Sequence, residues 1–153
     1  MTTTTRWIST ALLALAAASA TQAQPGSDPG AEAKPPKTNL LDHSTNSLID
    51  PAAAMKLVSD NIPARVWKLY PASKYSFVSQ VEGGLTANGT CVVTARLMLL
   101  PVTPAMKAVL FRPQKTATAF EAVPASSREQ CQALARDKLK EATTAVVSSL
   151  VKT

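Results

Sequence analysis

Two apolar patterns of different period constrain the fold of this chain more than any other feature. Between Thr90 and Leu100 every second residue is apolar, which is the period of a strand with one buried face: Cys91, Val93, Ala95, Leu97 and Leu99. From about Ser127 to Val151 apolar residues recur at steps of three or four, which place them on one face of a helix: Cys131, Ala135, Leu139, Ala142, Val146 and Leu150. Each pattern carries one of the two cysteines. The sequence therefore predicts a strand and a helix that share one core.

The N-terminus indicates the compartment in which this core forms. Arg6 supplies a positive charge, and the apolar run from Trp7 to Ala18 is shorter than the roughly 20 residues that a bilayer span needs. Small-x-Ala cleavage sites then end at Ala20 and Ala23. We predict that residues 1–23 are a cleavable signal peptide, with a cut after Ala20 as the alternative. The protein is then periplasmic or fully secreted, with no stable membrane insertion after cleavage.

Export bears on the oxidation state of the two cysteines. An even cysteine count in an exported protein is typical of a disulfide. Residues 91 and 131 are 40 positions apart, so a bond between them would stabilise the fold by ~4 kcal/mol in the chain-entropy model. A redox pair and a metal site are the alternatives. There is no Cys-x-x-Cys spacing, however, and the only histidine, His43, lies in the tail region.

The stretch that follows the signal differs in composition from the rest. Residues 24–37 contain four prolines and two glycines and almost no large apolar side chain, which is typical of a flexible linker. We predict a tether over residues 24–49, in which Leu40, Leu41, Leu48 and Ile49 are candidates for docking on the domain. The folded domain is predicted over residues 50–153.

Local signals divide this domain into helices and strands. Asp50 and Pro51 suit a helix start, and Pro63 should interrupt the helix before a second piece over residues 64–70. Strands are expected over residues 75–81, 90–100, 107–112 and 116–123. Turn signals lie at Gly83-Gly84 and Asn88-Gly89. Ser126 and Glu129 fit a capping box at the start of the last helix.

These elements predict a two-layer α+β domain. An antiparallel sheet of three to four strands should carry the N-terminal helix and the long C-terminal helix on one face. The disulfide should join the long C-terminal helix to the sheet. The other face of the strongest strand holds Arg96, Met98 and Leu100 among its residues. We predict that these three side chains contact a partner protein. The alternative is a solvated sheet face, which antiparallel sheets often have.

Catalytic and nucleic-acid signals are weak. No Gly-x-Ser-x-Gly motif occurs, the carboxylates are scattered, and His43 has no rigid context, so we expect no catalytic residue, no metal and no cofactor. The net charge of +6 falls to +5 without Arg6. No run of Lys and Arg exceeds two residues, which argues against nucleic-acid binding.

Three short blocks of sequence resemble a known family. They are residues 68–75, 89–97 and 130–135, within a stretch of about residues 62–140. They resemble the C-terminal domain of TolA, of the TonB/TolA-like envelope-spanning proteins, in which a helix, a cysteine-bearing strand and a helix with the partner cysteine follow in this order. The resemblance implies a periplasmic protein-binding domain without catalytic residues. Because this chain has a cleavable signal where that family has a membrane anchor, the energy-coupling role is not expected here.

The leading functional prediction is a non-enzymatic periplasmic module that binds another envelope or exported protein. Two alternatives stay open. A periplasmic inhibitor or immunity protein that neutralises an exported enzyme or toxin would have the same size and compartment. An enzyme with an unrecognised site is the less favoured alternative, because no nucleophile, base or metal cluster is visible in the sequence.

Overall fold

The computed structural model describes residues 39–103, 108–109 and 112–151. The predicted signal peptide over residues 1–23 and the first part of the predicted tether, residues 24–38, lie outside the described residues. The elements are β1 (Leu40–Asp42), α1 (Pro51–Asn61), α2 (Ala64–Leu69), β2 (Tyr75–Leu85), β3 (Cys91–Thr103), β4 (Ala108–Val109), β5 (Lys115–Val123) and α3 (Arg128–Leu150). This order confirms the predicted α+β class.

The main sheet runs in the order β1, β2, β3, β5, and β4 pairs with the far end of β3. Strand β3 is central and antiparallel to both β2 and β5. Strand β1, however, is parallel to β2, with Leu40 opposite Phe77. The sheet is therefore mixed: the predicted antiparallel pairing is found among β2, β3, β4 and β5, and β1 adds a parallel edge strand that was not predicted. The chain reaches β2 from β1 through α1 and α2, and such a crossover permits parallel pairing.

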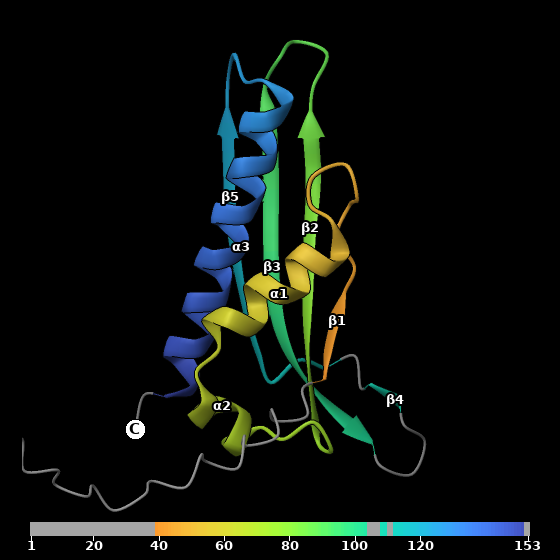
Figure 1. Ribbon diagram of the computed structural model, residues 1–153, viewed down its shortest axis with the longest axis vertical. Coiled ribbons are helices and arrows are strands. Elements are labelled where there is room, and N and C mark those ends of the chain that lie inside the picture. The colour runs from red at the N-terminus through yellow and green to blue at the C-terminus, as the bar shows by residue number, and fades with distance from the viewer. Residues whose placement is uncertain (1–38, 104–107, 110–111, 152–153) are drawn as a thin grey trace, which may run out of the picture. The chain divides into compact units, whose positions relative to one another are not determined.

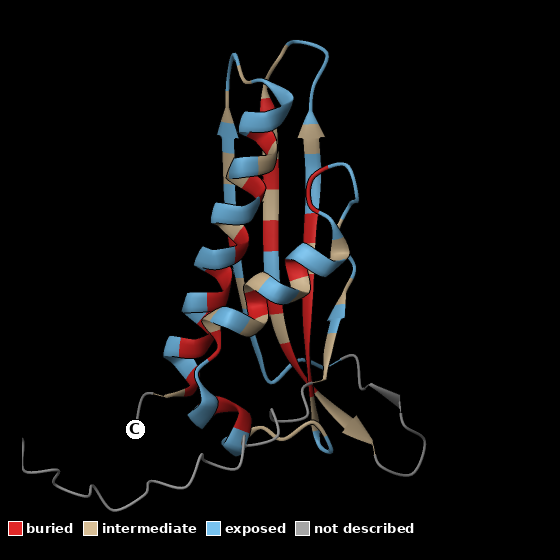
Figure 2. Ribbon diagram, viewed as in Figure 1, coloured by how far each residue is buried: buried red, intermediate tan, exposed pale blue. Residues whose placement is uncertain are grey.

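Helices α1 and α3 cover one face of this sheet, where α3 packs on β3 and β5 and α1 packs on α3, β1 and β2 (Figure 1). All six predicted apolar positions of α3 are buried, as are the five alternate apolar positions of β3. Figure 2 shows this buried stripe along α3 and the strands behind it. Both sequence patterns are thus confirmed, and they meet in one core.

The predicted disulfide lies within this core. Cys91 and Cys131 are bonded, with a Cα–Cα distance of 5.5 Å. Neither residue has more than 2% of its surface exposed. The bond joins the first residue of β3 to the first turn of α3, so it fixes the helix across the sheet at the end where both elements begin.

Capping interactions set the helix boundaries. The Asp50 side chain accepts a hydrogen bond from the Ala53 N–H at 3.0 Å, and Pro51 is the first residue of α1, as predicted. Helix α1 ends at Asn61, and α2 begins directly after Pro63. The capping box of α3 was predicted one residue too early. It is formed by Ser127 and Gln130, each of whose side chains bonds the other's backbone N–H.

The predicted tether extends too far along the chain. Leu48 and Ile49 are each only 3% exposed, and β1 forms the edge of the sheet. The cause is a polar network that composition alone does not reveal. The buried Ser79 hydroxyl donates to Asp42 Oδ1 at 2.6 Å, and the Ser44 hydroxyl donates to the same oxygen at 2.7 Å. The folded domain therefore includes residues 39–49.

The glycine pair at residues 83 and 84 does not form a turn, contrary to the prediction. Both residues continue β2, with Gly83 opposite Val93 and Gly84 opposite Val92. Their φ angles are 120° and 149°, in the region that favours glycine. A Cβ on Gly83 would lie 2.0 Å from the Val92 carbonyl oxygen, so the strand can pass there only without a side chain. The turn lies further on, at Asn88-Gly89.

Candidate binding site on the open face of the sheet

The second face of the sheet lies opposite the one that α1 and α3 cover. Strand register places its residues in rows across β2, β3 and β5. The central row consists of Gln80, Arg96 and Thr118. The next row towards the β2–β3 turn consists of Glu82, Thr94 and Phe120. The row on the other side of the central one consists of Val78, Met98 and Thr116. We call three residues of these rows, Arg96, Phe120 and Met98, the open-face patch.

Arg96 is exposed at the centre of this face. Its Nε–H donates to the Thr118 hydroxyl at 3.4 Å, which directs the side chain across the sheet towards β5. Arg96 makes no ion pair with any residue that the structure describes. Its guanidinium therefore offers donors to a ligand carboxylate, for which its planar fork is well suited.

Met98 is partly buried on the same face, two residues along β3 from Arg96. Leu100, two residues further along β3, lies on the same face but is only 7% exposed. Its neighbour across the strands is Ser76, which is fully buried. The prediction that Leu100 contacts a partner was therefore wrong. Its side chain is buried at the packed end of this face.

Phe120 is the residue of this site that the sequence prediction missed. It is 62% exposed, and it lies on the open face diagonally across from Arg96. Leu41 of β1, on the same face at the other edge, is 39% exposed. Phe120 shares the phase of Thr116 and Thr118 along its strand, so alternation within the predicted strand could have identified it. An exposed phenylalanine beside an arginine is a composition that protein interfaces favour.

The charges on this face are few. Among the described strand residues, Arg96 and Glu82 are the charged side chains that the register places here. Glu82 accepts a hydrogen bond from Gln80 Nε2 at 2.6 Å. The patch thus combines one cation that has no ion-pair partner among the described residues with apolar surface on both sides of it.

A different charge cluster lies on the covered side, between α3 and β5. The Lys138 Nζ is 2.6 Å from Glu121 Oε2 and 2.8 Å from Glu141 Oε2. The pKa of Lys138 is raised, first by its contact with Glu121 and then by its contact with Glu141. At the start of α3, hydrogen bonds from its own backbone N–H and from Ser127 lower the pKa of Glu129. These are structural ion pairs and caps that hold α3 in place.

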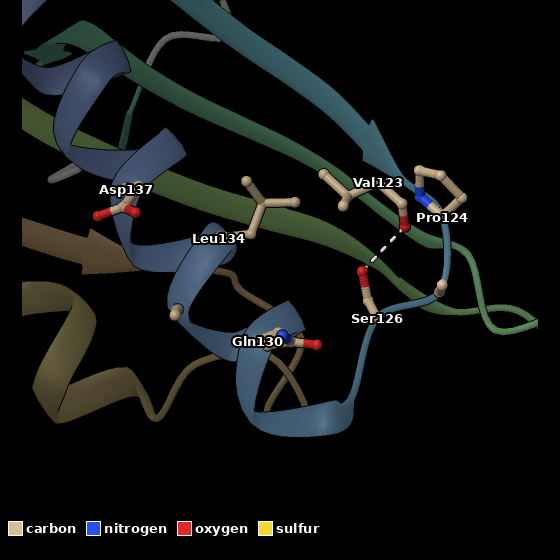
Figure 3. Close-up of a pocket in the computed structure, with 8 residues that line it drawn as sticks. Val123, Pro124, Ser126, Gln130, Leu134 and Asp137 are labelled. Carbon is tan, nitrogen blue, oxygen red and sulfur yellow. Dashed lines mark hydrogen bonds between the residues drawn. The ribbon is translucent and has the colours of Figure 1, made fainter.

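Two shallow hollows lie at the end of the domain near the start of α3. The first, of about 320 Å³, lies between the end of β5 and α3, and Ser126 and Asp137 are among its polar residues (Figure 3). The Ser126 hydroxyl donates to the Val123 carbonyl at 2.9 Å, which is a turn interaction. The second, of about 290 Å³, is lined by Ser47, Leu48, Gly83, Gly84, Leu85, Arg128 and Cys131. Neither hollow brings a serine to a histidine or pairs two carboxylates.

Candidate chemical residues are placed as follows. His43 is exposed directly after β1, and its backbone N–H donates to the Ser79 carbonyl at 2.9 Å. Ser79 bonds Asp42 but is fully buried, so a substrate cannot reach its hydroxyl. Among residues 39–103, 108–109 and 112–151, no group of three or more His, Cys, Asp or Glu side chains could hold a metal. None of the described helices is long and apolar enough to cross a membrane.

Comparison with known proteins gives structural matches only. No family model and no curated protein matches the sequence. The PelC dodecamer from Paraburkholderia phytofirmans is similar with a TM-score of 0.41, covering 72% of this chain and 87% of that chain at 11% identity. Protein XCC0632 from Xanthomonas campestris, of family DUF330, is similar with a TM-score of 0.38, covering 78% and 88% at 15% identity. The resemblance to the TolA domain is untested by these matches and stays a prediction.

Proposed function

We propose that this protein is a non-enzymatic, exported module that binds another protein of the bacterial envelope through the open-face patch. The observation that carries the proposal is the exposure of Phe120 and Arg96 together on a sheet face whose opposite side packs against α1 and α3. Arginine is among the side chains that contribute most at protein interfaces, and phenylalanine is enriched there. A bonded pair of cysteines supports an oxidising compartment such as the periplasm.

The chemistry of the patch also defines the partner's surface. Arg96 forms no ion pair within the described part of the chain, so its guanidinium can donate to a partner carboxylate, and Phe120 and Met98 present apolar surface to either side. The matching surface is an aspartate or glutamate beside an apolar cluster on a folded protein. A pair of this kind is worth most when the partner excludes water from it.

A capture experiment tests the proposal. The purified domain is immobilised, periplasmic extract from the native host is passed over it, and the retained protein is identified and then titrated in purified form. Arg96→Glu and Phe120→Ser should each weaken the affinity by at least about tenfold, which corresponds to about 1.4 kcal/mol. Lys140→Glu, which makes the same charge change at an exposed position of α3, should leave the affinity unchanged.

Equal affinity of all four proteins would overturn the assignment of the patch. If the immobilised wild-type domain retains no protein from the extract, the binding function itself is rejected.

A further inference from the structure

The outer edge of β5 has no strand partner among the described residues. Strand β5 pairs with β3 along one edge only, so its other edge presents backbone N–H and C=O groups that can pair with another strand. Edge strands are commonly protected by charges or prolines within the strand. Here the five residues from Thr116 to Phe120 are uncharged and contain no proline. The middle of this edge is therefore open to pairing.

The ends of this edge carry complementary charges. Lys115, the first residue of β5, is exposed and makes no ion pair with a described residue. Near the other end, Lys138 serves both Glu121 and Glu141, so this cluster has one ammonium for two carboxylates and keeps a net negative charge. Lys115 and Glu121 lie on the same face of the strand, because their partners on β3 are Leu99 and Val93.

We propose that a second copy of this chain pairs with the outer edge of β5, antiparallel and centred on Thr118. In this register Lys115 lies opposite Glu121 of the second copy, and the two-fold axis repeats this contact. Thr116 then lies opposite Phe120, and Ala117 lies opposite Ala119. A shift of the centre to Ala119 would place Lys115 opposite Val123, and a shift to Ala117 would place it opposite Ala119. Among these three registers, the one centred on Thr118 pairs both charges.

The position of α3 fits the same arrangement. Helix α3 packs on β3 and β5, as Figure 1 shows, so the two-fold axis would bring the two α3 helices about two strand spacings apart. Two spacings are about 10 Å, which lies at the upper end of the range in which helices pack.

The residues of α3 that would meet at the axis are small. Thr118 is three residues from Glu121, about 10 Å along the strand, and this length corresponds to about seven residues of helix beyond Lys138. That position is Ala145, which lies on the same side of α3 as Lys138 because the two are seven residues apart. Ala145 and Ser148 are exposed and small, so two helices can approach closely there.

This dimer would join two open faces into one continuous sheet surface, with an open-face patch on either side of the axis. The inference does not rest on the proposed function. Partner binding could fail while the dimer forms, and the dimer could fail while the patch binds its partner. The two are tested with different variants and different measurements.

A cysteine placed on the axis tests the register directly. Thr118 would lie opposite its own copy, where the Cβ–Cβ distance of an antiparallel pair is about 4.5–5.5 Å, close to disulfide range. Thr116 is the matched control, because it has the same residue type, strand, face and exposure. Two Thr116 positions would be about 13 Å apart, four residues along the strand, which is too far for a bond.

The exported chain carrying Thr118→Cys should therefore form a covalent dimer under mild oxidation, with at least about ten times the yield of Thr116→Cys. Peptide mapping should show the bond between the two introduced cysteines, with the Cys91–Cys131 bond intact. Equal yields from the two variants, or no dimer from either, would overturn the proposed register.

A charge exchange gives an independent test. Lys115→Glu and Glu121→Lys should each raise the dimer dissociation constant by about tenfold at low salt, because each replaces two attractive contacts by repulsive ones. The double variant restores opposite charges across the axis and should return to within about threefold of wild type. Sedimentation equilibrium measures all four proteins, and circular dichroism checks that each is folded. A monomeric wild type at hundreds of micromolar, or a double variant no better than the single ones, would reject the dimer.

Discussion

The two faces of the sheet differ most clearly at neighbouring residues of β3. Leu97 has no exposed surface, whereas Arg96, one residue earlier, is exposed and makes no ion pair with a described residue. Alternation along the strand sends one side chain into the core beneath α3 and the other to the open face. The same strand therefore serves stability through one face, while its other face is available for binding.

The difference in burial between the two faces indicates which residues can serve a function without a role in packing. On the covered face Phe77, Leu97 and Leu139 are each at most 1% exposed, and Trp67 packs edge-to-face on Phe77 with a centroid distance of 5.1 Å. Changes there would alter packing and hence the free energy of unfolding. On the open face Arg96 and Phe120 are exposed, so we expect substitutions there to have little effect on the fold.

Breaking the disulfide should have the largest effect on the covered face. The bond closes a loop between residues 40 positions apart, so its reduction should lower the free energy of unfolding by ~4 kcal/mol in the chain-entropy model. Urea unfolding with and without a reducing agent measures this difference. A loss below about 1 kcal/mol would mean that packing of α3 on the sheet holds the two elements together without the bond.

Shortening one side chain on each face should lower the free energy of unfolding by different amounts. Leu97→Ala should cost ~3 kcal/mol, because it leaves a cavity in a fully buried site. Met98→Ala is the matched control, since Met98 is the next residue on the same strand but is partly exposed on the open face. We expect a loss of less than about half as much. Denaturant unfolding of both variants gives the comparison, and equal losses would contradict the assignment of the two faces.

The covered face was largely predictable from the sequence, because burial imposes a period. Alternation in β3 and steps of three or four in α3 identified both apolar faces, and the cysteines placed them together. The edge of the sheet was not predictable in this way. Strand β1 has only three residues. It is held by a hydrogen bond from the Ser79 hydroxyl to Asp42 and by one from the Val81 N–H to the Ser44 hydroxyl. Each of these bonds joins residues 37 positions apart and leaves no periodic signal.

The open face was predicted only in part. Phase along β3 placed Arg96, Met98 and Leu100 on one side, but phase does not tell which of them neighbouring strands bury. Phe120 lies on a strand whose alanines weakened its prediction, so it was not considered as a contact. Its place near Arg96 depends on the register between β3 and β5, which a single sequence does not specify.

Alanine substitutions at the two glycines of β2 should lower the free energy of unfolding by different, smaller amounts. Gly83→Ala should cost ~2 kcal/mol, because a Cβ would meet the Val92 carbonyl oxygen at 2.0 Å and the positive φ adds strain. Gly84→Ala shares a positive φ, but no atom lies within 4 Å of its Cβ, so we expect ~1 kcal/mol. Thermal melts of both variants measure the difference. Equal losses would assign the whole effect to backbone conformation.

The smallest expected effect is the most informative about function. Phe120→Ser should change the free energy of unfolding by no more than ~0.5 kcal/mol, because 62% of this side chain is already in water. Such a small loss would mean that an exposed phenylalanine is retained for a reason other than stability. If urea unfolding shows a loss of about 2 kcal/mol instead, Phe120 belongs to the packing of the domain, and the open-face patch loses its apolar contact. An unchanged stability together with weaker partner binding would separate the two faces by role: one folds the protein and the other recognises its partner.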